Sequence, residues 1–94
     1  MATREASAAA RLRAAIEIEQ RRLAQGDRPL YHVRWTEAAG GAVDVTVSEL
    51  PIIHLFVPDP EGVLHGARLL IVRTLTADPD SFDVTANPDA GRHT

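Results

Sequence analysis

The sequence predicts a two-layer α+β domain in which helices cover one face of an antiparallel sheet. Two long segments have apolar residues at helical spacing, four short segments favour strands, and the segments follow the order α-β-β-β-α-β. The 94 residues suffice for one domain. We expect an N-terminal helix within residues 1–28, a core domain over residues 29–86 and a flexible tail over residues 87–94.

Residues 4–25 are expected to form the first helix. Alanine, the best helix former, is frequent in this segment. Leu12, Ile16 and Leu23 lie near one face at helical spacing, although Glu19 interrupts this stripe. Because helix propensity alone does not hold such a helix together, the apolar stripe needs a partner surface. That surface is either the sheet of the same chain or a second copy.

Three strands are expected after this helix. Residues 30–36 and 43–47 alternate apolar and polar side chains, and the Gly40-Gly41 pair between them permits a hairpin turn. Residues 52–57 form a third apolar run between two prolines, too short for a helix. The predicted core consists of one face of the hairpin and two residues of the second helix: Tyr31, Val33, Trp35, Val43, Val45, Val47, Leu70 and Ile71.

The second helix is expected to start at Asp59-Pro60-Glu61, which combines an N-cap residue, a proline in the first turn and an early acidic residue. Its apolar residues between Val63 and Leu75 recur at helical spacing and form a broad stripe that can cover the sheet. Residues 81–86 alternate again and predict a fourth strand.

Composition excludes several classes of protein. The chain has no cysteine, so it has neither disulfides nor thiolate metal sites. It lacks both a membrane-length apolar run and the pattern of a secretory signal, so we expect a cytoplasmic protein with no membrane partner. Residues 1–28 hold six Arg and four acidic residues, whereas residues 29–94 hold four Arg and nine acidic residues. An acidic core is a poor nucleic-acid binder but suits a basic protein partner, unless the charge only serves solubility.

The side chains that could support catalysis show no known pattern. No serine lies in a glycine-flanked nucleophile turn, and no histidines have metal-ligand spacing. Four carboxylates could gather at one end of the sheet and hold Mg²⁺, although two of them already have a role at a helix start. These carboxylates are Asp44, Glu49, Asp59 and Glu61. We therefore expect no enzymatic activity, no cofactor and no metal.

The stretch from Tyr31 to Ile71 resembles the HicB-like antitoxin family. Like that family, it has an aromatic-led strand, a glycine-containing hairpin and a second alternating strand. A corner at residues 48–51 follows, and then a helix in which Ala67, Arg68 and Ile71 match the family pattern. The resemblance implies a partial RNase H-like core that neutralises a small basic RNA-cleaving toxin by protein contact. It also implies a dimer or a higher even oligomer. Only eight residues follow the last strand, so the family's C-terminal DNA-binding module is not expected.

The predicted function is therefore non-enzymatic binding of a protein partner, as a HicB-like antitoxin or an orphan relative. The alternative is a small RNA-binding or regulatory module, because double-stranded RNA-binding domains share the α-β-β-β-α order. Those domains need basic residues where this helix starts with Asp59-Pro60-Glu61. A small core also favours a homodimer. Its predicted interface consists of Leu12, Ile16 and Leu23, or of Phe82 and Val84.

Overall fold

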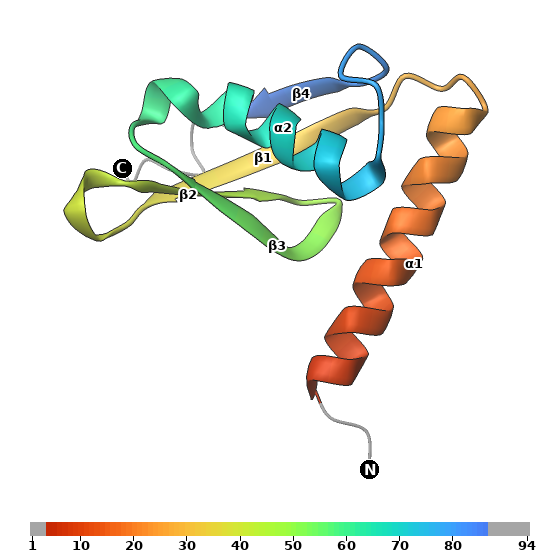
Figure 1. Ribbon diagram of the computed structural model, residues 1–94, viewed down its shortest axis with the longest axis horizontal. Helices are drawn as coiled ribbons and strands as arrows, with labels where there is room; N and C mark the ends of the chain where they lie inside the picture. Colours follow the sequence, from red (N-terminus) through yellow and green to blue (C-terminus); the bar gives the residue numbers. More distant parts are fainter. Residues whose placement is uncertain (1–3, 87–94) are drawn as a thin grey trace.

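In the computed structural model, which describes residues 4–86, two helices and a four-stranded sheet confirm the α+β class and the order α-β-β-β-α-β (Figure 1). The predicted tail over residues 87–94 lies outside the described residues. Short 3₁₀ turns precede β2 and α2. The elements are α1 (Arg4–Ala24), β1 (Leu30–Glu37), β2 (Val43–Val47), β3 (Leu50–Val57), α2 (Val63–Leu75) and β4 (Asp83–Ala86).

The four strands lie side by side in the order β3-β2-β1-β4. β1, β2 and β3 pair antiparallel, as the hairpin pattern predicts, but β4 pairs parallel with β1. The sheet is therefore mixed, which corrects the expectation of an antiparallel sheet at its last strand. The cause is the connection: α2 carries the chain back along the sheet, and a crossover of this kind returns the next strand in a parallel direction.

Alternation along the strands places the core between the sheet and α2. Tyr31 and Val33 of β1, and Val43, Val45 and Val47 of β2, are buried on this face. Two expected core residues, Trp35 and Leu70, are only partly buried at its margin. Conversely, Phe82 has no exposed surface, and its ring meets Tyr31 edge-on at 5.5 Å between centroids.

α1 lies beside the end of the sheet where β3 begins and α2 ends (Figure 1), and it contacts both of those elements. Ile16 and Leu23 pack against the core cluster of the same chain. Glu19, which interrupts the apolar stripe, is buried, and its carboxylate accepts hydrogen bonds from the Tyr31 hydroxyl at 2.9 Å and from Arg22 Nη1 at 3.0 Å. Glu19, which breaks the apolar stripe, therefore links α1 to the core through a hydrogen bond.

Two polar contacts raise the pKa of a side chain, one at Tyr31 and one at Arg28. Burial, reinforced by the hydrogen bond to Glu19, raises the pKa of the Tyr31 hydroxyl. At the β4 edge of the sheet, Arg28 Nε donates to Asp83 Oδ2 at 2.9 Å, and this carboxylate raises the pKa of Arg28. Within residues 4–86, neither helix has the length and apolar character that crossing a membrane requires.

Candidate functional site: an open sheet face and a free strand edge

One face of the sheet carries no helix within the described residues, because α1 and α2 both pack against core residues of the opposite face. Alternation directs polar side chains of every strand to this open face. Phe56 of β3 lies among them with 56% of its surface exposed. The open face consists of His32, Arg34, Thr36, Asp44, Thr46, His54, Phe56 and Thr85.

Two histidine–carboxylate contacts cross this face. His54 Nδ1 lies 3.0 Å from Asp44 Oδ1, and the His54 ring meets Phe56 edge-on at 5.3 Å between centroids. His32 contacts Glu49 through its ring, and its backbone N–H donates to Glu49 Oε1 at 2.9 Å. These contacts orient the imidazoles and leave their exposed edges available to a partner.

The four candidate metal ligands do not gather. Asp44, Asp59 and Glu61 lie toward the end of the sheet where Val43 pairs with Val57, whereas Glu49 follows the opposite end of β2. Across residues 4–86, no group of three His, Asp or Glu side chains is close enough to hold a metal ion. The suggestion that these carboxylates form one metal-binding cluster is therefore wrong, for Glu49 and for the other three alike, and the absence of enzymatic activity stays a prediction.

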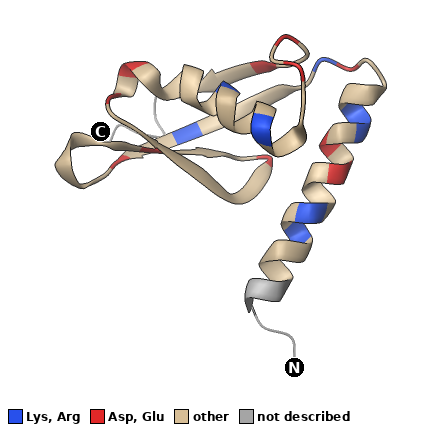
Figure 2. Ribbon diagram, in the orientation of Figure 1, with Lys and Arg blue, Asp and Glu red and all other residues tan. Residues whose placement is uncertain are grey.

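The charges are segregated along the chain. Residues 35–67, which form the hairpin, β2, β3 and the start of α2, contain five acidic residues and no Arg. Exposed Glu37, Asp59 and Glu61 surround the end of the sheet where β3 leads into α2, which we term the acidic end. Figure 2 shows acidic residues at the start of α2, with arginines on α1 and toward the end of α2. The acidic end therefore presents a negative electrostatic potential.

β3 forms an outer edge of the sheet, and only one of its sides is paired. Three residues, from Pro51 to Ile53, bulge out between the β2 pairings of Leu50 and His54. Within this bulge Ile52 has a φ of 64° and an exposed side chain. A β-branched residue with positive φ is unusual, and strain of this kind concentrates at functional sites.

A groove runs between the free edge of β3 and α2. Its volume is about 690 Å³, and its floor is apolar, with Leu55, Leu69 and Leu70 contributing. His54, Arg73 and Thr74 line its sides. Leu69 is 47% exposed. An apolar floor beside an unpaired strand is the geometry that accepts an added strand, because backbone and side-chain contacts form together.

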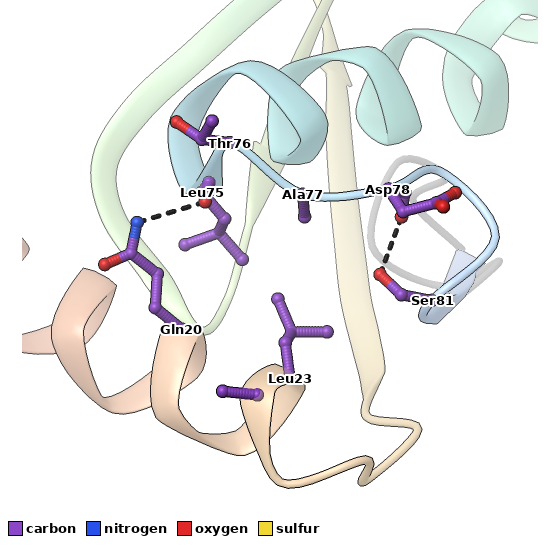
Figure 3. Close-up of a pocket in the computed structure, with 8 residues that line it drawn as sticks. Gln20, Leu23, Leu75, Thr76, Ala77, Asp78 and Ser81 are labelled. Carbon is purple, nitrogen blue, oxygen red and sulfur yellow. Dashed lines mark hydrogen bonds between the residues drawn. The ribbon is translucent and has the colours of Figure 1, made fainter.

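A second hollow lies where α1 meets the end of α2 (Figure 3). Its polar groups are already engaged: Gln20 Nε2 donates to the Leu75 carbonyl at 3.0 Å, and Ser81 Oγ donates to the Asp78 carbonyl at 2.6 Å. The Asp78 side chain accepts from the backbone N–H of Asp80. The Gln20 bond joins α1 to the end of α2, and the other two bonds hold the loop after α2. Together they leave few groups free to bind a ligand.

The structure uses the predicted interface residues within a single chain. Ile16 and Leu23 pack against the core, Leu12 is partly buried on the same side of α1, and Val84 contacts both core clusters. Phe82 is wholly internal, so it has no surface to offer a second copy.

Sequence reasoning did not single out Phe56, Leu69 or Arg73 as surface residues. The sequence held no signal for the free edge, because the apolar run from Ile52 to Val57 fits an edge strand and a central strand equally well.

No protein-family model, curated protein or solved structure that was compared with the chain matches it. The resemblance to HicB-like antitoxins therefore stays a prediction, and functional inference rests on the surfaces described above.

Proposed function

We propose that this protein is a non-enzymatic binding module for a small basic protein, as a HicB-like antitoxin or an orphan relative of that family. The acidic end is the observation that carries this proposal. Glu37, Asp59 and Glu61 are exposed there, in a segment of 33 residues without one Arg. Such a field attracts a basic partner, speeds its encounter and disfavours partners of the same sign.

Charge alone steers a partner without holding it, because exposed ion pairs each contribute little free energy. The adjoining open face supplies what stable binding needs. Phe56 is a half-exposed aromatic ring held edge-on by His54, and aromatic residues are enriched among the side chains that dominate binding energy. Arg34 and Thr36 on the same face provide polar contacts around it.

The RNA-binding alternative fits this surface poorly. A phosphate backbone would meet the exposed carboxylates of Asp59 and Glu61 at the start of α2, where double-stranded RNA-binding domains carry basic residues. The exposed Arg11, Arg13 and Arg21 lie on α1, away from that position. A labelled RNA duplex is therefore the negative control of the experiment below.

The test begins with the genes that flank this one. We expect a neighbouring short reading frame for a basic protein, which arrests growth when expressed alone and is neutralised by co-expression of this chain. Calorimetry on the purified pair then compares two double variants of equal charge change. Glu37→Gln with Asp59→Asn acts at the acidic end and keeps an N-cap at position 59, whereas Glu17→Gln with Asp27→Asn alters exposed residues outside the acidic end.

We expect the acidic-end variant to weaken binding roughly tenfold at low salt and the control variant to leave it unchanged. Persistent growth arrest on co-expression, equal effects of the two variants, or binding of the RNA duplex in place of the protein would overturn the proposal.

A further inference from the structure

We infer that the groove between β3 and α2 binds an acidic amphipathic helix of another protein. The apolar side of that helix lies on the leucines of the groove floor, and a carboxylate one turn further along it pairs with Arg73. The groove shares no residue with the acidic end, so this inference does not rest on the proposed function.

The shape of the groove follows from how α2 passes over β3. At Gly66 the helix touches the strand, because a methyl group there would lie 2.7 Å from Val57 Cγ1 and 3.3 Å from Leu55 Cδ2. One turn further along, α2 carries the larger Leu69 and Leu70. Together with Leu55 they form the apolar floor of the groove, whose volume is about 690 Å³. The groove therefore begins beyond the point of closest contact between helix and strand.

The part of β3 that borders the groove is the regular part of the strand. His54 and Leu55 pair with Thr46 and Val45 of β2 in unbroken register, and the bulge lies before them at residues 51–53. The regular stretch after the bulge has only four residues, fewer than the 5–6 of an average strand, about a turn of hairpin in length. Backbone pairing along this edge is therefore limited, and side-chain contacts must supply most of the affinity.

The openness of the groove favours a helix over a small molecule. The groove has two walls, one from α2 and one from β3, and Leu69 on its floor keeps 47% of its surface exposed. Small-molecule sites instead bury about 70–90% of their ligand. An amphipathic helix suits an open groove with an apolar floor, because its apolar side is covered while its polar side stays in water.

The charge of the groove selects the sign of its partner. Arg73 lines the groove one helical turn after Leu69, and no Asp or Glu lines it. In the part of the chain that the structure describes, the ion pairs involve other side chains, so the Arg73 guanidinium has no carboxylate partner. Thr74 adds a hydroxyl beside it, and His54, whose Nδ1 is engaged by Asp44, forms the opposite wall. A carboxylate of the partner is therefore the group that complements this end of the groove.

The spacing of these groups defines the pattern of the partner. Leu69 and Arg73 are four residues apart, which is about 6 Å along α2. A docked helix matches them with an apolar residue and an Asp or Glu three or four positions apart, and a second apolar residue on the same side reaches Leu55. This pattern is opposite in charge to the basic partner of the acidic end, so the two surfaces select different proteins.

Selection from a displayed peptide library tests this inference. The library consists of helix-forming peptides of roughly 16 residues, long enough for helicity, in which the positions on one side vary freely. We expect the full chain to select peptides that have two apolar residues one turn apart and an acidic residue one turn further. A selected peptide, labelled with a fluorophore, then gives affinities by anisotropy at low salt. Circular dichroism confirms that each variant of the protein folds.

Two matched pairs of variants locate the site. Leu69→Gln should weaken binding about tenfold, whereas Leu64→Gln should leave it unchanged, because Leu64 is similarly exposed at 45% but does not line the groove. Arg73→Glu should weaken binding of the acidic peptide about tenfold and favour a peptide with Lys at the acidic position. Arg11→Glu, at an exposed position of α1, should do neither.

Several outcomes would overturn the inference. Failure to select any peptide, selection of basic peptides, or equal effects within either pair of variants would each do so. A wild-type dimer in sedimentation that Leu69→Gln dissociates would give the groove to a second copy. An unchanged peptide preference in Arg73→Glu would leave Arg73 only its favourable place at the end of the α2 dipole. None of these outcomes bears on the basic partner, whose binding depends on Glu37 and Asp59.

Discussion

The stability of this protein at alkaline pH should depend on one side chain, Tyr31. The chain contains a single tyrosine and no cysteine, and all ten of its basic residues are arginine. No other side chain therefore titrates between about pH 9 and pH 12. Tyr31 has no exposed surface, and its hydroxyl donates to Glu19 at 2.9 Å. Burial is the first cause that raises its pKa, and the hydrogen bond to a carboxylate is the second.

The size of the effect follows from proton linkage. In the unfolded chain Tyr31 ionises with a pKa of about 10, whereas in the folded chain it keeps its proton to higher pH. The stabilisation is fully present below pH 10. Above it the unfolded chain binds fewer protons than the folded chain, so stability falls as pH rises. Between pH 9 and pH 11 the free energy of unfolding should decrease by about 1.4 kcal/mol.

Urea unfolding followed by the fluorescence of Trp35, the only tryptophan, measures this loss at pH 9, 10 and 11. The matched variant is Tyr31→Phe, which keeps the ring and removes the ionisable group. We expect this variant to be less stable at pH 9, because Glu19 loses a hydrogen-bond donor, yet to change little between pH 9 and pH 11. In the wild type, tyrosinate absorbance should appear only as the chain unfolds.

Two results would refute this reasoning. The first is an equal loss of stability between pH 9 and pH 11 in Tyr31→Phe, which would place the titrating group elsewhere. The second is tyrosinate absorbance in the folded chain with a midpoint near pH 10, which would mean that the hydroxyl meets water.

Three further substitutions test individual contacts by chemical and thermal unfolding. Glu19→Ala should cost about 1–3 kcal/mol, because it leaves the buried hydroxyl of Tyr31 without an acceptor; an unchanged unfolding midpoint would contradict this. Gly66→Ala gains about 1 kcal/mol in an ordinary exposed helix. Here the added methyl group lies 2.7 Å from Val57 Cγ1, so we expect a loss of about 1–3 kcal/mol, and a higher melting temperature would disprove the close packing. Ile52→Asn should raise stability by about 1 kcal/mol, because Asn tolerates the φ of 64° and little apolar burial is lost; a decrease would contradict the strain assigned to Ile52.

Local pattern determined the elements of this protein. Helical spacing of apolar residues predicted a helix over residues 4–25 where α1 spans Arg4–Ala24, and strict alternation predicted β1 and β2. These features depend on residues close together in the chain, since a helix and a hairpin each define a face through their own period. The helix start at Asp59-Pro60-Glu61 was also predicted from neighbouring residues alone. In the structure, Asp59 accepts a hydrogen bond from the Gly62 N–H.

Only the tertiary structure decided what each face meets. In the sequence pattern, Glu19 only interrupts the apolar stripe of the first helix. In the structure, Glu19 is buried and accepts a hydrogen bond from the Tyr31 hydroxyl of β1. Phe82 seemed available to a second copy, but the parallel return of β4 beside β1 buries it. Trp35 alternates with the core yet lies at its margin. The direction of β4 depends on how α2 crosses the sheet. That crossing is decided by contacts between residues far apart in the chain.

The candidate binding surfaces divide in the same way. The acidic balance of the core domain is a property of composition, and the sequence by itself determined that a basic partner suits it. Which carboxylates share one end, and that Glu49 is not among them, required the strand register. The free edge of β3 also had no local signature, because an unpaired strand and a central one are both apolar runs. An edge exists only once the order β3-β2-β1-β4 is set, and that order is decided by contacts across the whole chain.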